Sequence, residues 1–259
     1  MKLQFYKYQG TGNDFIMIDN RNNQFPKNNT KLIHKLCDRR FGIGADGLIL
    51  LETSEKSDFT MVYFNADGNE GSMCGNGGRC IIAFANNLRI IEEESTFEAV
   101  DGLHYAFIEN GIVSLKMIDI DTIESFKEHL FLNTGSPHHI SFNKDVENID
   151  VKELGSKIRY GTPYFKEGTN VNFAEQISDN SFKVRTYERG VEDETLACGT
   201  GVTAVAIAAH KSNKTNANSI NIEVLGGQLE VSFQQEGNVY KNVFLKGPAQ
   251  FVYEGKIEI

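Results

Sequence analysis

An internal repeat constrains this chain more than any other feature of its sequence. A shift of about 124 residues aligns much of the first half with the second. YFNADGNEGSMCGNG at 63–77 meets TYERGVEDETLACGTG at 186–201, so that Cys74 falls on Cys198. The other matched pairs, in the same order along the chain, are 11–19 with 134–142, 32–40 with 151–160 after a slip of several residues, 44–52 with 168–176, 58–64 with 182–188, and 97–107 with 222–233. Because the order of segments is retained, the repeat predicts two halves of similar fold.

Each half shows the same succession of elements. A short β run precedes an amphipathic helix, two further strands follow, and a glycine-rich turn carries the cysteine into an apolar helix. The apolar helices lack a polar face, so each should be buried in the middle of its own half. AspGly, AsnGly and GlyGly dipeptides at 101–102, 110–111 and 226–227 predict hairpins. The predicted helices are 32–40, 79–88, 151–160 and 201–211, and the clearest strands are 47–52 and 59–65.

These elements predict an α+β fold of two pseudo-symmetric domains, each a strongly curved mixed or antiparallel sheet around a central apolar helix. The first domain should cover 1–118 and carry Cys74, and the tail 248–259 should return to add a strand to it. The second should cover 119–247 and carry Cys198, with the polar stretch 118–130 bridging the two. The active site is expected in the cleft between them.

Composition excludes several classes of function. The chain carries a net charge of −9 and no lysine or arginine cluster, which argues against nucleic acid as a partner. The first ten residues lack an apolar signal segment and no apolar stretch approaches membrane length, so a cytoplasmic protein without a membrane partner is expected. The four cysteines are too few for a disulfide scaffold, and without a CxxC pair they do not predict a metal site.

Cys74 and Cys198 share one setting, in which a strand and a polar turn lead to cysteine, glycine, a small residue, glycine and a helix. A thiol at a helix N-terminus lies near unpaired N–H groups and the positive end of the helix dipole, which lower its pKa. Two such groups can invert a carbon stereocentre, because one removes a proton from one face and the other delivers a proton to the opposite face. No lysine motif or dinucleotide fingerprint is present, so the pattern predicts a cofactor-independent racemase or epimerase.

Other interpretations of these cysteines remain open at this stage. Two thiols of low pKa could form a reversible disulfide in a redox protein, although resolving pairs usually lie closer in sequence. A non-enzymatic binding module is a third class. Cys37 and Cys80 are interpreted as buried apolar residues, and Asp67 as part of a polar turn. The glycine-rich GTGNDF at 10–15 leads into a strand, so it does not predict a nucleotide site.

Four motifs together resemble the diaminopimelate epimerases: GTGNDF (10–15), FGIGADG (41–47), FNADGNEGSMCGNGGRC (64–80) and ERGVEDETLACGTG (188–201). The resemblance spans nearly the whole chain. It implies the two-domain fold, no cofactor, and the interconversion of L,L- and meso-diaminopimelate on the route to lysine and peptidoglycan. Because members of the family are often dimers, a homodimer is the expectation that the resemblance adds; the residues themselves do not bear on it.

The resemblance also implies roles for individual residues. Cys74 and Cys198 would be the catalytic base and acid, and His138 and Glu188 would support catalysis. An arginine such as Arg189 can bind a carboxylate, and Glu188 an ammonium group. Asn172 competes with Asn170 for one of the asparagine positions. The residues expected to bind substrate are Asn13, Asn65, Gly75, Asn76, Asn170, Glu188, Arg189, Gly199 and Thr200.

Three departures from the family pattern affect the expected recognition of the distal end of the substrate. Ser136 replaces a frequent asparagine before Pro137-His138, Glu192-Asp193 lengthens a loop, and Gly47 stands where some members have a glutamine that contacts substrate. Proline racemases and hydroxyproline epimerases are the nearest alternative, since they set two cysteines in a related fold. Their smaller substrates need fewer polar partners than this chain offers, which favours diaminopimelate.

Overall fold

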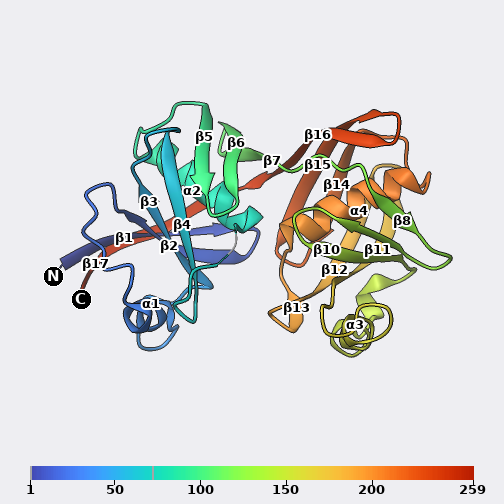
Figure 1. The fold of residues 1–259 in the computed structure, drawn as a ribbon, viewed down its shortest axis with the longest axis horizontal. Coiled ribbons are helices and arrows are strands. Elements are labelled where there is room, and N and C mark those ends of the chain that lie inside the picture. Colours follow the sequence, from blue (N-terminus) through green and yellow to red (C-terminus); the bar gives the residue numbers. More distant parts are fainter. Residues whose placement is uncertain (1, 72) are drawn as a thin grey trace. The chain divides into compact units, whose positions relative to one another are not determined.

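The protein, described by a computed structural model for residues 2–71 and 73–259, folds into two compact units (Figure 1). The first unit comprises the chain up to Leu115 together with Gly247–Ile259, and the second is Lys116–Lys246. The final strand of the chain therefore belongs to the unit in which the chain begins.

The first unit is a mixed sheet with two helices. Its strands are β1 (Lys2–Gly10), β2 (Asn13–Asp19), β3 (Gly47–Glu52), β4 (Phe59–Asn65), β5 (Glu94–Ala99), β6 (Gly102–Glu109), β7 (Ile112–Lys116) and β17 (Gln250–Glu258). Its helices are α1 (Thr30–Cys37) and α2 (Gly75–Asn87).

The second unit has a similar set of elements, with the short strand β13 and a 3₁₀ turn in addition. Its strands are β8 (Ile123–Ser125), β9 (Leu130–Asn133), β10 (Pro137–Phe142), β11 (Asn170–Ser178), β12 (Ser181–Glu188), β13 (Asp193–Thr195), β14 (Ser219–Val224), β15 (Gly227–Glu236) and β16 (Val239–Pro248). Its helices are α3 (Val151–Tyr160), α4 (Gly199–Lys211) and a short 3₁₀ turn at Val146–Asn148.

The two sheets repeat one another strand by strand. In the first unit the pairing order is β17–β1–β2–β3–β4–β5–β6–β7, and in the second it is β8–β9–β10–β11–β12–β14–β15–β16. In both, only the third and fifth pairs are parallel, and the others are antiparallel. The agreement of order and strand sense shows that the sequence repeat is a repeat of fold, and the predicted α+β class is confirmed.

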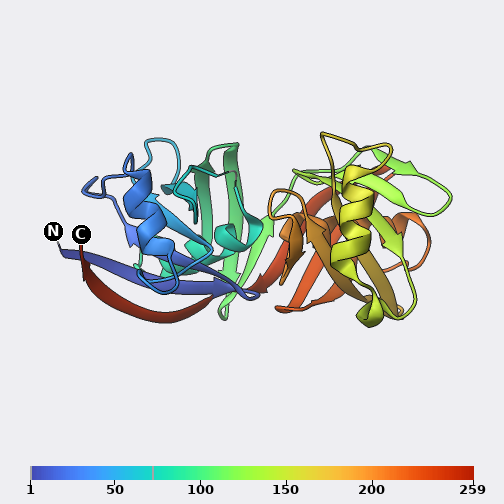
Figure 2. The ribbon, with the colours of Figure 1, turned by 90° about the horizontal axis from the view of Figure 1, so that it is seen from below.

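A buried helix forms the centre of each unit. In α2 every residue from Gly75 to Ala85 is buried, and in α4 the buried run extends from Gly201 to Ala209. The α4 helix packs within a cluster that includes Ile140 of β10 and Val184 of β12. Helices α1 and α3 pack instead against the other face of their sheets (Figure 2). Ile33 and Leu48 belong to one apolar cluster there, and Val151 and Val171 to another.

Most of the predicted elements agree with the structure. The predicted strands 47–52 and 59–65 coincide with β3 and β4, the predicted helix 151–160 coincides with α3, and all three dipeptides lie in hairpin turns. Helix α1 was predicted to extend to 40 but ends at Cys37. The reason is local: Asp38 leaves the helical conformation, and its side chain accepts hydrogen bonds from the N–H groups of Arg40 and Phe41, both at 2.7 Å.

Two further expectations differ from the structure. The sequence predicts that the central helices start at 79 and 201, because glycine is a poor helix former. They start earlier, at Gly75 and Gly199, since the glycines are buried in the first helical turn and this packing outweighs their low helix propensity. The stretch 118–130, expected to bridge the halves, lies within the second unit. Ile120 is buried there and pairs with Tyr240, and β8 pairs with β9 as β17 pairs with β1.

Gly155 gives a direct test of how α3 packs on β12. A Cβ atom at this position would lie 2.4 Å from Cβ and 2.6 Å from Cγ of Tyr187. In a helix without this contact, replacing glycine by alanine stabilises by up to about 1 kcal/mol. We expect Gly155→Ala to lower the free energy of unfolding instead, by about 1–3 kcal/mol, because the ring of Tyr187 must move.

Urea denaturation followed by circular dichroism measures this change. Ser156→Ala is the matched control, since it lies next in the same helix and is only half-buried. An increase in stability on Gly155→Ala would contradict the packing described here.

Candidate functional site

Cys74 and Cys198 are the N-cap residues of the two central helices. Both have extended backbones, with φ −107° and ψ 124° for Cys74 and φ −114° and ψ 108° for Cys198. Their carbonyl groups accept the first helical hydrogen bonds, from Gly78 at 2.7 Å and from Val202 at 2.9 Å. The N–H groups of the first turn have no partners within such a helix, so each cysteine lies beside donors that suit an anion.

In the first unit, Asn13 contacts both Cys74 and the first turn of α2. The sulfur of Cys74 lies 3.7 Å from Oδ1 of Asn13, and Nδ2 of Asn76 lies 3.4 Å from the same oxygen. The amide orientation of Asn13 follows from its other end, where Nδ2 donates to the carboxylate of Asp46 at 2.5 Å. Three of the residues expected in the site therefore form one cluster.

Arg79 is a buried cation beneath this cluster, and it was not identified as a site residue from the sequence. Its side chain is fully buried and donates to Oγ1 of Thr11 at 2.7 Å and to Oδ1 of Asn76 at 3.1 Å. Burial lowers the pKa of the guanidinium, and interaction with Cys80 and Cys74 opposes that change. By holding Oδ1 of Asn76, Arg79 directs the amide nitrogen of Asn76 toward Asn13.

Asn65 ends β4 opposite Gly47, which starts β3 and in turn pairs with Phe15 of β2. A Cβ atom at Gly47 would lie 2.5 Å from a ring carbon of Tyr63 and 2.6 Å from the carbonyl oxygen of Phe64. Both the ring and the backbone of β4 therefore leave no room for a side chain at Gly47. Asp67 lies in the turn that follows, where its side chain accepts from the N–H of Asn69 at 2.9 Å, as the interpretation of a polar turn predicted.

In the second unit, His138 connects the start of α4 to the sheet. Its Nε2 lies 2.9 Å from the hydroxyl of Thr200, and that hydroxyl lies 3.5 Å from the sulfur of Cys198. His138 is fully buried on β10, and burial, with a smaller effect of Arg189, lowers its pKa to about 3. Considered without the family resemblance, a histidine after proline suggests a loop residue; the structure shows a buried strand residue instead.

Asn170 holds the turn that carries Arg189. Its Oδ1 accepts from the N–H of Arg189 at 2.8 Å, and its Nδ2 donates to Oγ of Ser136 at 2.8 Å and to the carbonyl of Pro137 at 3.0 Å. Ser136, the residue at the family's asparagine position, is thus a partner of Asn170. The structure brings Asn170 and Arg189 together, but the side-chain amide of Asn170 is hydrogen-bonded to the backbone of Arg189 and Pro137.

Glu188 ends β12 one residue before Arg189, and burial raises the pKa of its carboxyl group. The lengthened loop after it is fixed by Glu192, whose carboxylate accepts from Arg159 at 3.1 Å and from the N–H of Gly190 at 3.0 Å. The buried guanidinium of Arg159 therefore holds the far side of the turn that presents Arg189.

Cys37 and Cys80 behave as the sequence predicted. Both are buried, and burial raises the pKa of each thiol to about 12. Within residues 2–71 and 73–259, no group of three or more histidine, cysteine, aspartate or glutamate side chains could hold a metal ion. Among the helices of the same residues, none has both the length and the apolar character needed to cross a membrane.

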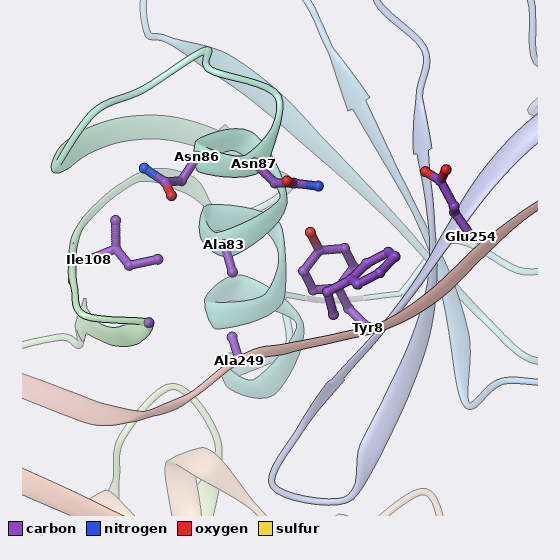
Figure 3. Close-up of a pocket in the computed structure, with 9 residues that line it drawn as sticks. Tyr8, Ala83, Asn86, Asn87, Ile108, Ala249 and Glu254 are labelled. Atoms are coloured by element: carbon purple, nitrogen blue, oxygen red, sulfur yellow. The ribbon is translucent and has the colours of Figure 1, made fainter.

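A cavity of about 480 Å³ lies elsewhere in the first unit, near the C-terminal end of α2 (Figure 3). It is lined by Tyr8, Asn86, Asn87 and residues of the final strand, including Glu254. Cys74 is at the opposite end of that helix, so this cavity is separate from the cysteine cluster.

Comparison with known proteins identifies the relatives of the chain. The family model described as diaminopimelate epimerase matches residues 5–105 and 130–252. The diaminopimelate epimerase of Flavobacterium psychrophilum is 60% identical over 98% of this chain and 100% of its own length. That of Chlorobaculum tepidum is 41% identical over 96% of this chain and 99% of its own.

Solved structures share the fold at low sequence identity. A phenazine biosynthesis protein of the PhzF family from Bacillus anthracis superimposes with a TM-score of 0.78 at 16% identity, with 100% of both chains covered. A hydroxyproline epimerase from Agrobacterium vitis gives a TM-score of 0.70 at 15% identity, over 99% of this chain and 91% of the other. These likenesses establish the architecture alone.

Because the two histidines of β10 are buried, the free energy of unfolding should decrease in acid. Burial lowers the pKa of His138 from 6.5 to about 3 and that of His139 from 6.5 to about 4. Between these values and 6.5 the unfolded chain binds more protons than the folded protein. We therefore expect the free energy of unfolding to fall as the pH is lowered through this window, with a slope that approaches about 1.4 kcal/mol per pH unit for each histidine.

Urea denaturation at a series of pH values between 4 and 7 measures the slope. His138→Gln should flatten it, whereas His34→Gln, at an exposed histidine of α1, should leave it unchanged. Equal slopes for wild type and His138→Gln would contradict the burial of a neutral imidazole.

Proposed function

The chain belongs to the diaminopimelate epimerase family, and we propose that it interconverts L,L- and meso-diaminopimelate with Cys74 and Cys198 as a thiolate–thiol pair and without a cofactor. The product would serve lysine and peptidoglycan precursor synthesis, and the enzyme would act in the cytoplasm. The observation that carries the mechanism is the placement of one cysteine at the N-cap of the central helix in each repeat.

The chemistry follows from what two such thiols can do. A thiolate removes the α-proton from one face of the substrate, and the thiol of the other cysteine delivers a proton to the opposite face. After one turnover the protonation states of the two cysteines are exchanged, so the pair serves both directions of the reaction. Negative charge that develops beside the α-carboxylate would be stabilised by the first-turn N–H groups of Gly75 and Asn76, and of Gly199 and Thr200.

The remaining polar residues would recognise the substrate. Asn13 and Asn65 would contact its polar groups in the first unit, and Arg189 would bind a carboxylate in the second. The position of Asn170 supports a role in aligning Arg189, since its amide is engaged with the backbone of that turn. Glu188 would hold an ammonium group, and His138 would act next to Cys198 through Thr200.

Proton NMR of the reduced protein in D₂O tests the proposed reaction. With L,L-diaminopimelate we expect loss of the α-proton signal together with appearance of the meso isomer, because the delivered hydron comes from solvent. A parallel sample contains L-proline and should remain unchanged. Exchange in the proline sample alone would reassign the substrate, and exchange in neither sample would exclude the two-thiol epimerase.

Single substitutions test whether both cysteines are needed. We expect Cys74→Ala and Cys198→Ala each to reduce epimerisation to less than about a tenth of the wild-type rate, a barrier increase of more than about 1.4 kcal/mol. Cys37→Ala, which changes a buried cysteine of α1 outside the cluster, is the matched control, after circular dichroism has verified the fold of all three variants. Either active-site variant with a rate near that of the control would argue against two essential thiols.

A further inference from the structure

A chain of buried polar side chains leads from the sheet of the second unit to Cys198. His138 and Asn172 are fully buried and Thr186 is nearly so, at 3% exposure. The three lie on adjacent strands and on one face of the sheet. Asn172 of β11 pairs with Thr186 of β12, and His138 of β10 pairs with Asn170, two residues before Asn172. Buried polar groups are costly unless they are hydrogen-bonded, so their orientation is well defined.

The fold does not require polar residues at these positions. In the first unit the structurally equivalent pairs are Met17 with Ile49, and Ile49 with Tyr63, and Phe15 occupies the position that His138 has in the second. Strand pairing thus places Ile49 at the position of Asn172, one residue from the match that the sequence repeat of 44–52 with 168–176 predicted. The residues of the central helices correspond as well: a Cβ at Gly77 would meet Ile49 at 3.0 Å, and one at Gly201 would meet Asn172 at 2.4 Å. One repeat thus has a largely apolar surface under its cysteine helix where the other has His138, Asn172 and Thr186.

The orientation of Asn172 follows from its partners. Its Nδ2 lies 3.1 Å from the carbonyl oxygen of His139, which can only accept, so this atom is the amide nitrogen. Its Oδ1 accepts from the hydroxyl of Thr186 at 3.0 Å. The same Nδ2 lies 3.0 Å from Nδ1 of His138, and it therefore donates to that ring nitrogen.

The position of the histidine proton follows in turn. Because Nδ1 of His138 accepts, the neutral ring carries its proton on Nε2 and donates it to the hydroxyl oxygen of Thr200 at 2.9 Å. The hydroxyl proton of Thr200 must then point elsewhere, and the sulfur of Cys198 lies 3.5 Å from that oxygen. A hydrogen bond donated to sulfur stabilises a thiolate more than a thiol.

We propose that Asn172, held by Thr186, is a positioning residue that keeps the proton of His138 on Nε2, so that Thr200 donates to Cys198 and favours its thiolate. The charged group that acts on His138 is Arg189, on the turn after β12. At the other cysteine, the contact with Asn13 presents an acceptor oxygen to the sulfur, and Arg79 places a positive charge beneath it. The inference rests on the proposed function for its catalytic meaning, but its physical content concerns the second unit alone.

The first measurement is the tautomer of His138 by long-range proton–nitrogen NMR of protein with ¹⁵N-labelled histidine. We expect the Nε2–H pattern in the wild type, and a proton on Nδ1 in Asn172→Asp, because a carboxylate accepts where the amide donated. His138→Gln assigns the signal. A wild-type ring protonated on Nδ1 would overturn the proposal. If Asn172 did not control the tautomer, Asn172→Asp would leave the proton of His138 on Nε2, which would also overturn it.

The second measurement is the pH dependence of alkylation of Cys198 by iodoacetamide, followed by peptide mass spectrometry. The midpoint should rise by about one pH unit in Asn172→Asp and in Thr200→Val, a tenfold smaller thiolate fraction at a given pH below the midpoint, because one hydrogen bond to a charged acceptor is lost. Thr200→Ser retains the hydroxyl and should keep the wild-type midpoint. Asn221→Asp adds the same charge at an exposed position of β14 and should also keep it.

The set of variants still tests the proposal if one of them does not fold. If Asn172→Asp does not fold, the contrast between Thr200→Val and Thr200→Ser still decides, and equal midpoints for these two would overturn the proposal. Neither measurement uses diaminopimelate. Absence of epimerisation with the expected tautomer and midpoints would therefore reject the proposed function but support the arrangement around Cys198.

Discussion

The close approach of a glycine-rich first turn to the sheet is the constraint on which each half of this molecule depends. Gly77 passes over Ile49 and Gly201 over Asn172 at distances that leave little or no room for a Cβ atom. This contact buries the start of an apolar helix, and the residue just before that start is a cysteine in both halves. The first-turn N–H groups and the thiol are thereby presented together, because both belong to the end of the same buried helix.

Duplication has kept this scaffold and has changed the chemistry beneath it. The strand order and strand sense are the same in both units, even to the added strand, which is β17 in one and β8 in the other. Beneath α2 the side chains are mostly apolar, with Arg79 as a buried cation within the helix itself. Beneath α4 they form a hydrogen-bonded chain that reaches Thr200. Two thiols on equivalent backbones can therefore differ in their preferred protonation state.

Much of the fold could be predicted because its signals are local. Short apolar runs predicted β3 and β4, helical spacing predicted α1 and its repeat predicted α3, and the turn dipeptides predicted the hairpins. The errors arose where packing overrides propensity: glycines start α2 and α4, and the polar stretch 118–130 supplies Ile120 and β8 to the second unit. Arg79 could not be identified as a site residue from the sequence, because the sequence does not indicate which groups a single cation in an apolar helix contacts.

The sequence by itself determined the repeat, the two cysteines before glycine-rich helices and the family to which the chain belongs, because these depend on the order of residues alone. Only the tertiary structure decided what each candidate side chain contacts. Asn170 accepts a hydrogen bond from the backbone of Arg189, and Thr186 and Asn172 belong to the hydrogen-bonded chain that leads through His138 toward Cys198. Those contacts join residues on different strands and turns, and the direction of each hydrogen bond follows from donors and acceptors that only packing brings together.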